Sequence, residues 1–481
     1  MGTPNKLTIL QINDSHGYLR EHDELFFRNG KEIYKKAGGY ARIATLFNKI
    51  KQENPEGIII LDNGDTIHGT FLAIKSRGKG MLPILNKLNL DAMTAHWEFA
   101  YGPKELKQIE EALHFPILGI NCFHKDTDEL FFKPYIILER LDYKIGVIGI
   151  ACNIIDKTMP PAFSQGLYFT LGNDELPKYI KKLREKGVDL IVGLSHLGYP
   201  QELQLAKEVN DIDVLLSGHT HNRVYNPVIE NGAIIIQSGC HGSFIGKLDL
   251  FINEGEIEGY DHQLINVNAQ IDEDLNVKEM IERLYSPHRQ LLETVIGETN
   301  TGLHRYHVLE SKMDNLLLDS LLDASGRNLA FSNGWRYGAP IPPRKISIND
   351  VWNIVPTNPP ISICDISGKD LWDMMEENLE HTFSRDPYNQ MGGYVKRCKG
   401  IHVYFKIENP EGKRIQEFFI GDDRLEKTKK YKACYLTEQG IPNKYGSNHE
   451  KLDIRAIDAL KKYIKHHSPI KIEKYNSIVP I

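Results

Sequence analysis

The sequence predicts an α/β fold built from more than one domain. Apolar runs typical of buried strands, such as Leu7–Ile12, Gly57–Leu61 and Leu190–Leu194, alternate in the first half with segments of helical spacing such as Ala41–Glu53. The second half mixes helix and strand patterns less regularly. A length of 481 residues favours about two to four domains, and 41% hydrophobic residues supply enough apolar surface for separate cores.

The other elements are predicted from the same two patterns, apolar runs for strands and helical spacing for helices. Short apolar runs bounded by polar or glycine-containing segments predict strands, and apolar residues three or four positions apart predict helices. In the first half they predict helices at Met81–Leu88 and Leu176–Lys186, strands at Ala92–Thr94 and Val214–Leu216, a hairpin of Tyr135–Leu138 with Lys144–Ile150, and a β-rich stretch at Ala233–Ile252. In the rest of the chain the same patterns predict helices at Val277–Val295, Lys312–Ala324 and Asp370–Leu379, and strands at Ile401–Ile407 and Tyr431–Thr437.

Charge and composition narrow the class of partner. The net charge is −6 with the signs interspersed, so we expect a small-molecule partner rather than nucleic acid or an anionic membrane. The segment Met1–Asn13 carries no apolar stretch long enough for a secretory signal, which leads us to expect a cytoplasmic location. Six cysteines are scattered without CxxC spacing, which is typical of reduced thiols.

Side chains able to bind metals recur where predicted strands end. The run Gly57–Leu61 breaks into Asp-Asn-Gly-Asp, which places Asp65 at the carboxyl end of a buried strand. Open α/β sheets carry their chemistry at that end. Any one of these residues is more often a turn or loop residue, but the set recurs at several strand ends: Asp14, His16, Asp65, His96, His196, His219 and His221.

The spacing of these residues points to metal ions. In Asp14-x-His16 and His219-x-His221 the interval of two turns both side chains of each pair to the same side of an extended segment. Imidazole nitrogens combined with carboxylates suit zinc, manganese or iron better than calcium or magnesium. The number of candidates fits two ions that share one carboxylate.

Four motifs resemble those of a known family. They are Asn-Asp-x-His at 13–16, Gly-Asp at 64–65, Ser-His-Leu-Gly at 195–198 and Gly-His-Thr-His at 218–221. In this order they resemble the calcineurin-like metallophosphoesterases, specifically the 5′-nucleotidase/2′,3′-cyclic phosphodiesterase group.

The resemblance implies an architecture. It implies a four-layer α/β/β/α metallophosphoesterase domain over residues 1–270 and a linker helix region over 271–300. A smaller α+β substrate-binding domain over 301–481 would follow.

The resemblance also implies a ligand set and a substrate. One ion would be held by Asp14, His16, Asp65 and His221. The other would be held by Asp65, His196 and His219, with Asp65 bridging. The implied cofactors are two divalent transition metal ions, manganese or zinc, with iron as a further option. The implied partner is a small phosphate ester or nucleotide.

The segment around His96 departs from the family pattern. The family usually has Gly-Asn-His-Glu/Asp-Phe here, and alignment on Glu98 places His96 at the asparagine ligand and Trp97 at the catalytic histidine. A register shifted by one residue would make His96 the catalytic histidine and leave Ala95 as the ligand; we prefer His96 as a ligand. The loop resembles the variant in the thiosulfohydrolase of bacterial sulfur oxidation, a dimanganese branch of the superfamily.

Three loops of the second half bear on the substrate. The segment Phe331–Arg336 resembles Asn-Ser-Gly-Gly-x-Arg, which makes Arg336 a candidate contact for an oxyanion; the alternative is a surface ion pair. The glycine loop that ends at Arg397 resembles one that presents a base-stacking aromatic, and Tyr394 and Arg397 are its substrate-binding candidates. The late segment Thr437–Pro442 lacks the second stacking aromatic of the nucleotidases, so tight adenine sandwiching is not expected.

The expected activity is hydrolysis of phosphate esters, nucleotides first, by a metal-activated water. With Trp97 at the position of the usual acid, His241 in Gly-Cys-His-Gly is the candidate proton donor. Two alternatives stay open: a hydrolase of sulfur-containing esters, and a metal-bound binding protein with weak catalysis.

Overall fold

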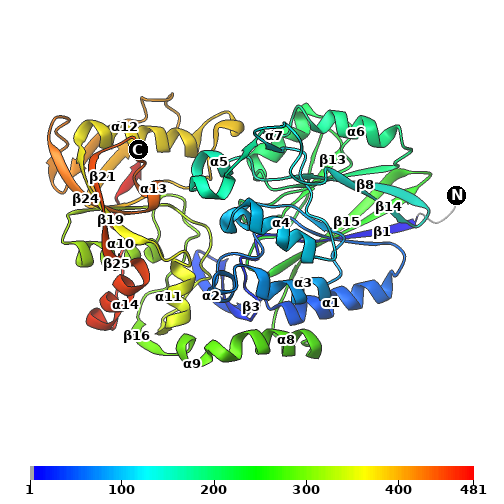
Figure 1. The fold of residues 1–481 in the computed structure, drawn as a ribbon, viewed down its shortest axis with the longest axis horizontal. Helices are drawn as coiled ribbons and strands as arrows, with labels where there is room; N and C mark the ends of the chain where they lie inside the picture. Colours follow the sequence, from blue (N-terminus) through cyan, green and yellow to red (C-terminus); the bar gives the residue numbers. More distant parts are fainter. Residues whose placement is uncertain (1–4) are drawn as a thin grey trace. The chain divides into compact units, whose positions relative to one another are not determined.

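The chain divides into two compact units (Figure 1). The computed structural model describes residues 5–481, so the first four residues of the predicted first domain lie outside the described part. The N-terminal unit contains the described chain up to His22 together with Lys36–Pro287, and the C-terminal unit contains Asp23–Lys35 together with His288–Ile481. Among the described residues, no helix is both long enough and apolar enough to cross a membrane.

Two sheets form the centre of the N-terminal unit. Alternate apolar side chains of both sheets, such as Ile9, Ile59 and Val192, meet in one core between them. In spatial order the first sheet is β15 (Glu256–Asn266), β14 (Phe244–Asn253), β1 (Asn5–Ile12), β4 (Ile58–Asp62) and β5 (Ala92–Met93). The second is β12 (Val228–Glu230), β13 (Ala233–Ile236), β11 (Val214–Leu216), β10 (Leu190–Ser195), β8 (Tyr143–Ile150) and β7 (Tyr135–Arg140).

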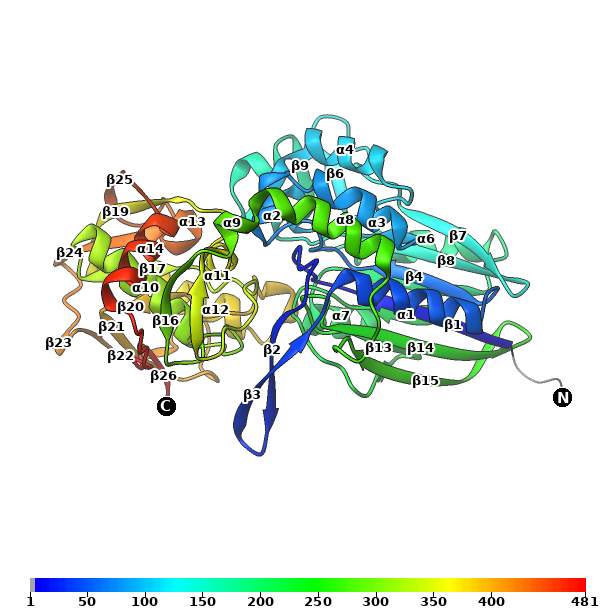
Figure 2. The same ribbon diagram turned by 90° about the horizontal axis from the view of Figure 1, so that it is seen from below.

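Helices cover the outer faces of both sheets. Apolar residues of α6 (Leu176–Arg184) and α7 (Tyr199–Glu208) pack on the second sheet. The helices α1 (Tyr40–Glu53), α3 (Leu82–Lys87) and α8 (Leu275–Tyr285) lie beside the first sheet in Figure 2. This arrangement confirms the predicted α/β/β/α layering. The remaining short elements of the unit are α2 (Phe71–Lys75), η1 (Lys79–Met81), η2 (Trp97–Tyr101), α4 (Pro103–Ala112), β6 (Cys122–His124), α5 (Ile155–Thr158), η3 (Pro161–Ser164) and β9 (Leu167–Phe169).

Strand direction gathers the loops that carry polar residues. In the first sheet β1, β4 and β5 run parallel, and in the second β8, β10, β11 and β13 run parallel. The carboxyl ends of neighbouring parallel strands lie at the same edge of a sheet. The segments that follow β1, β4, β5, β10 and β11 are those with the predicted metal ligands.

The C-terminal unit is a mixed α+β body with its own core. Buried residues of α12 (Gly368–Phe383), such as Leu371 and Met375, pack against strand residues such as Phe331 and Val403. Its sheets comprise β20 (Arg397–Lys399), β17 (Leu329–Ser332), β24 (Lys430–Leu436), β19 (Pro360–Ser367) and β25 (Ser447–Arg455); β23 (Asp423–Arg424), β22 (Ile415–Ile420), β21 (Ile401–Phe405) and β26 (Ile478–Pro480); and β16 (Val295–Thr299) with β18 (Arg344–Ser347). Its helices are α10 (Lys312–Ser325), α11 (Ile348–Ile354), α12 (Gly368–Phe383), η5 (Pro387–Asn389), α13 (Thr437–Gly440) and α14 (Ala456–His467).

The segment joining the two halves differs from its prediction. Instead of one helix over Val277–Val295, α8 ends at Tyr285 and is followed by η4 (Ser286–His288) and α9 (Arg289–Leu292). Pro287 has no backbone N–H to continue the helix, which explains the break. Val295 begins a strand instead of ending a helix.

A hairpin that the sequence patterns did not predict belongs to the C-terminal unit. It consists of β2 (His22–Arg28) and β3 (Lys31–Ala37). The hydroxyl of Tyr306 donates to the buried carboxylate of Glu24 at 2.6 Å, and Nε2 of His304 lies 3.0 Å from Glu32 Oε1. The hairpin is therefore held to the C-terminal unit by polar contacts of its acidic residues.

Candidate metal centre

The seven predicted ligands meet in two groups at the carboxyl ends of the strands. Within each group the donor atoms all lie within 4.8 Å of one another, and every member is buried. The first group is Asp14, His16 and His221, and the second is Asp65, His96, His196 and His219.

Asp65 lies against both groups. Its Oδ2 is 3.3 Å from His196 Nε2 and 3.1 Å from His96 Nδ1, which belong to the second group. The same oxygen is 3.8 Å from Nε2 of His16, which belongs to the first. The first group is closed by a distance of 3.0 Å between the Nε2 atoms of His16 and His221. One carboxylate is thus placed to serve two ions.

The donor chemistry fits transition metal ions. Nδ1 of His196 donates to the Asn63 carbonyl, which leaves the lone pair on Nε2 free to coordinate. That buried Nε2 faces Asp65 Oδ2 at 3.3 Å, inside the second donor group. Imidazoles and carboxylates together are the ligands preferred by zinc, manganese and iron.

Burial and neighbouring charges shift the pKa values of the clustered carboxyl and imidazole groups. Burial alone would raise the pKa of the Asp65 carboxyl, but the imidazoles of His96, His196 and His16 outweigh it and hold that pKa well below its usual range. Burial alone would lower the pKa of His196, but Asp65 and Asp14 raise it to about 10. Burial lowers the pKa of His16 to about 3. The carboxylates therefore carry their charge at neutral pH.

Most of the predicted ligands have a strained backbone conformation. A non-glycine residue with positive φ costs conformational energy and persists only where its surroundings hold it. Five of the seven predicted ligands have such a φ: Asp14 (50°), His16 (48°), Asp65 (56°), His219 (69°) and His221 (59°).

The loop around His96 has the register that places this residue among the other donors. His96 belongs to the second donor group, whereas the indole of Trp97 lies outside it and stacks on His68 with ring centroids 4.6 Å apart. The backbone N–H of Trp97 donates to Asp65 Oδ1 at 2.8 Å. The geometry favours His96 as a ligand and leaves no imidazole at position 97.

His241 lies beside the first donor group. Its ring centroid is 6.0 Å from that of His16 and 5.9 Å from that of His221. Nδ1 of His241 is 3.5 Å from the thiol sulfur of Cys240. Burial alone would raise the pKa of Cys240, but His241 and His221 lower it to about 6. Our sequence reasoning missed this thiol, although its place next to His241 was a usable signal.

Comparison with known proteins identifies the two units. Residues 7–223 match the family model of calcineurin-like phosphoesterases, and residues 295–437 match that of the 5′-nucleotidase C-terminal domain. The chain belongs to the calcineurin-like phosphoesterases of the 5′-nucleotidase type. Both the recognised family and the two-domain fold class of this type are thereby confirmed.

Individual relatives are distant in sequence. The trifunctional nucleotide phosphoesterase YfkN of Bacillus subtilis is 25% identical over 86% of this chain, and the chain spans only 30% of that longer protein. The sulfate thiohydrolase SoxB of Thermus thermophilus superposes with a TM-score of 0.91 at 22% identity, covering 99% of this chain and 96% of SoxB. A 5′-nucleotidase precursor of the same organism gives a TM-score of 0.87 at 21% identity, with 99% of each chain covered. These structures establish the shared fold.

Two loops of this phosphoesterase's C-terminal unit pack together around Arg336. Its half-buried guanidinium lies 4.8 Å from the centroid of the Tyr394 ring, as a cation–π contact requires. Gly393 has a φ of +75°, and a Cβ there would collide with Nη2 of Arg336. The glycine loop is thus shaped to admit this guanidinium.

Arg397, the other predicted substrate contact of this loop, lies inside the C-terminal unit. Its side chain is fully buried, and its Nε lies 2.9 Å from a carboxylate oxygen of Asp314. Its Nη1 and Nη2 donate to the carbonyls of Val308 and His307 at 2.9 and 2.7 Å. Its donors are used inside the unit, so the geometry gives no support to the prediction that Arg397 binds substrate. Its guanidinium instead supports the Tyr394 ring at 5.0 Å.

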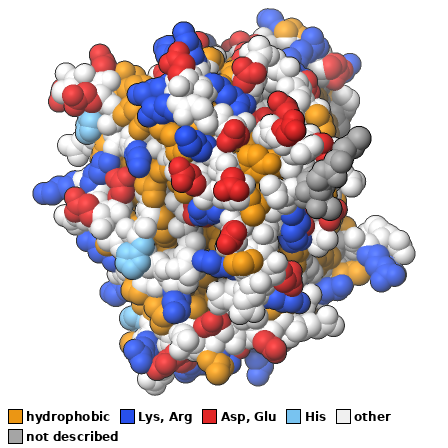
Figure 3. All heavy atoms as spheres, turned by 90° about the vertical axis from the view of Figure 1, so that its right-hand side faces the viewer, with side chains coloured by type: hydrophobic (Ala, Val, Ile, Leu, Met, Phe, Trp, Pro, Cys, Tyr) orange, Lys and Arg blue, Asp and Glu red, His pale blue; other side chains and the backbone are white. Residues whose placement is uncertain are grey.

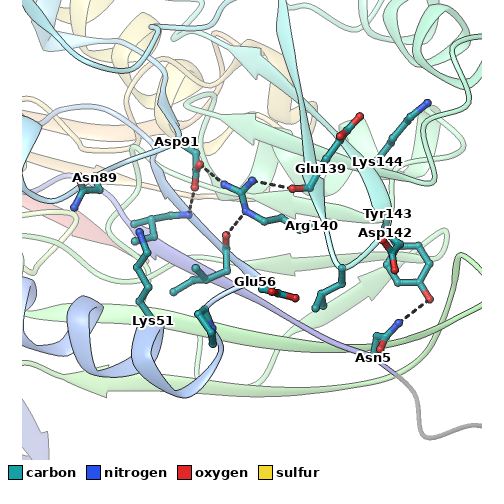
Figure 4. Close-up of a pocket in the computed structure, with 14 residues that line it drawn as sticks. Asn5, Lys51, Glu56, Asn89, Asp91, Glu139, Arg140, Asp142, Tyr143 and Lys144 are labelled. Atoms are coloured by element: carbon teal, nitrogen blue, oxygen red, sulfur yellow. Dashed lines mark hydrogen bonds and ion pairs between the residues drawn. The ribbon is translucent and has the colours of Figure 1, made fainter.

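Figure 4 shows the lining of a cavity of about 880 Å³, which includes none of the seven predicted ligands. It is lined by Asn5 and Tyr143, which begin β1 and β8, whereas the donors follow the carboxyl ends of strands. Arg140 reaches Asp91 at 2.7 Å and donates to the Ile58 carbonyl at 2.7 Å, so its guanidinium joins β7 of the second sheet to β4 of the first. On the face drawn in Figure 3, acidic and basic side chains are interspersed, so this face offers a ligand no field of one sign.

Proposed function

We propose that this protein is a dinuclear metal-dependent hydrolase of phosphate esters, with nucleotides as its first substrate class. The observation that carries the proposal is the pair of buried donor groups on either side of Asp65. Membership of the phosphoesterase family supports the coarser reaction class. Two ions, manganese or zinc, are the proposed cofactors.

The chain's own residues would hold the ions and position them. Asp14, His16 and His221 would hold one ion and His96, His196 and His219 the other, with Asp65 between them. When bound, such ions activate water and neutralise the charge that develops on the ester. Backbone contacts fix the ligands beforehand: the N–H of His219 donates to Asp14 at 2.9 Å. No protein nucleophile is required for this chemistry.

Arg336 and Tyr394 are the proposed substrate contacts of the C-terminal unit. A guanidinium offers a fixed fork to a phosphate or carboxylate, and the cation–π contact with Tyr394 fixes its direction. The half-buried guanidinium of Arg336 lies against one side of the Tyr394 ring, which favours recognition of an anionic group there over a tight sandwich around a base.

His241 is the proposed proton donor to the leaving group. Trp97 has no ionisable proton to give, and His241 lies near the first donor group. General acid help contributes about 10² to 10⁴-fold in rate. His241→Ala should therefore slow alkyl esters more than aryl esters, whose leaving groups need no proton.

A second candidate function is hydrolysis of sulfur-containing esters. The run His96-Trp97-Glu98 favours it, because it resembles the variant of the thiosulfohydrolase branch and lacks the acid that an alkoxide leaving group needs. SoxB, which shares the fold, is by name a sulfate thiohydrolase.

Substrate assays with defined metals separate these functions. Chelator-treated protein reloaded with Mn²⁺ or Zn²⁺ is assayed on AMP, UDP-glucose, p-nitrophenyl phosphate, bis-p-nitrophenyl phosphate and a thiosulfonate ester. Metal-dependent cleavage of the phosphate esters supports the first function. Cleavage of the thiosulfonate ester alone supports the second. Two bound ions without turnover of any substrate would indicate a binding protein.

A further inference from the structure

Glu98 is a fully buried carboxylate that points into the backbone of the site. Its Oε1 accepts the N–H of Thr66 at 2.7 Å. Its Oε2 accepts the N–H of His96 at 2.8 Å and that of Asp65 at 3.2 Å. One side chain thus binds the backbone of two metal ligands that lie on different loops.

The loops that carry Asp65 and His96 also contact each other directly. The N–H of Trp97, next to Glu98, donates to Asp65 Oδ1 at 2.8 Å. Gly64 approaches Thr94 so closely that a Cβ on Gly64 would lie 2.7 Å from the Thr94 carbonyl oxygen. Asp65 itself is held at a φ of 56°. A strained, closely packed arrangement of this kind needs contacts that fix it.

The chemistry of a carboxylate suits this place better than that of an amide. An ionised carboxylate has two acceptor oxygens, and here each receives at least one N–H. A glutamine of the same shape has one acceptor and one NH₂ group, so it would turn a donor toward a backbone donor. The site therefore distinguishes Glu98 from its isostere.

The first donor group is connected to the same loop by other contacts. The N–H of His16 donates to the Asp65 carbonyl at 2.7 Å, and the N–H of Asp14 donates to the Gly64 carbonyl at 2.9 Å. Asn13 Nδ2 additionally donates to Asp14 Oδ2 at 2.7 Å. These contacts do not pass through Glu98, so its effect should fall mainly on the second group.

We propose that Glu98 is a positioning residue for the second ion. It holds the backbone from which Asp65 and His96 converge, and it contacts neither the ion nor the substrate. The inference rests on the proposed function, because it presumes that two ions bind to these groups. The Glu98→Gln variant should weaken the second ion at least tenfold and the first less than threefold, in keeping with the 10- to 100-fold losses seen for residues that orient ligands.

The test is Mn²⁺ binding to chelator-treated protein by titration calorimetry. Asp249→Asn is the matched control, because Asp249 is also a buried carboxylate of this unit but binds Thr8 at 2.6 Å and Lys247 at 2.6 Å on the sheet. The control should bind both ions as the wild type does. In turnover assays, Glu98→Gln should show reduced activity at low Mn²⁺ that recovers at high Mn²⁺, which a general loss of folding would not produce.

Glu98→Asp provides a second variant if the glutamine chain does not fold. It keeps the charge and both acceptors but shortens the reach, so weakening in the same direction and of smaller size is expected. Wild-type protein with two ions, and Glu98 variants with unchanged affinities or with both ions weakened equally, would overturn the inference alone. Fewer than two ions in the wild type would overturn the proposed function and the inference with it.

Discussion

The donor groups of the N-terminal unit and the Arg336 loops of the C-terminal unit are built differently. The donors follow the ends of rigid parallel strands, are buried, and are fixed by backbone hydrogen bonds. Arg336 and Tyr394 lie half-buried on loops and are connected by a cation–π contact and a glycine with positive φ. Strand ends fix the direction of a side chain from its sequence position alone, whereas loops depend on partners elsewhere in the chain.

The largest effect in the first region is expected from a substitution of Asp65, the carboxylate that both donor groups share. Asp65→Asn should lose ion binding in both groups and reduce kcat by at least about 10² to 10³-fold, the scale seen when one electrostatic stabiliser is removed. Metal content and turnover measure this. Asp249→Asn is the control, because this buried carboxylate binds Thr8 and Lys247 on the sheet and contacts none of the donors. Equal losses in both variants would break the distinction.

The second region is tested by its two arginines. Arg397→Gln should lower the free energy of unfolding by about 3–5 kcal/mol, because it removes one of the two guanidinium partners of the buried Asp314 carboxylate and the donors to the carbonyls of Val308 and His307. Arg336→Gln should leave stability within about 0.5 kcal/mol and raise KM instead. Urea unfolding and steady-state kinetics separate the two effects. A raised KM with unchanged stability in Arg397→Gln would restore it as a substrate contact.

Substitutions in the loop around His96 test whether this residue, which follows the end of a strand, is a metal ligand. His96→Ala should weaken one ion by about 10- to 100-fold, because only the imidazole has a lone pair to offer. Trp97→Phe, one residue later, should leave both ions bound. Metal titration measures both. If His96→Ala binds metals as the wild type does while its pH–rate profile changes, the shifted register is correct and His96 acts as the acid.

The smallest of the expected effects is the change of ion affinity with pH. In the metal-free protein, Asp65 and Asp14 raise the pKa of His196 to about 10, so this imidazole is protonated at pH 7 and must lose its proton when an ion binds. Ion affinity should therefore increase with pH, by up to about tenfold per unit for each proton released. Calorimetry in buffers of different ionisation enthalpy counts the protons. Uptake without proton release would show that the cluster is already neutral.

The sequence predicted the donor groups almost completely because two simple rules apply there. Apolar runs located the strands, and the interval of two residues in Asp14-x-His16 and His219-x-His221 paired the ligands. What the sequence could not show were partners distant along the chain. The Cys240 thiol meets His221 only through the fold, and Glu98 meets Thr66 across two loops.

The same limit explains the differences between prediction and structure. Nothing local to Arg397 indicates that Asp314 will neutralise it, so a glycine-rich loop made it a plausible substrate contact. The hairpin β2–β3 alternates charged and apolar residues too irregularly to predict, and its acidic residues gain their function only beside Tyr306 and His304. Pro287 was a local signal, and it should have ended the predicted helix.

The hairpin makes the two units topologically interleaved. The chain passes between them at His22–Asp23, at Lys35–Lys36 and at Pro287–His288, so each unit is assembled from separate stretches of sequence. Cleavage after Pro287 would therefore not release two independent halves, because the hairpin would stay packed on the C-terminal fragment and hold the pieces together as a nicked complex. A chain shortened to end at that point would carry the Glu24 carboxylate without Tyr306 to bind it. Separating the units as soluble halves requires the hairpin to be replaced by a short turn between His22 and Lys36.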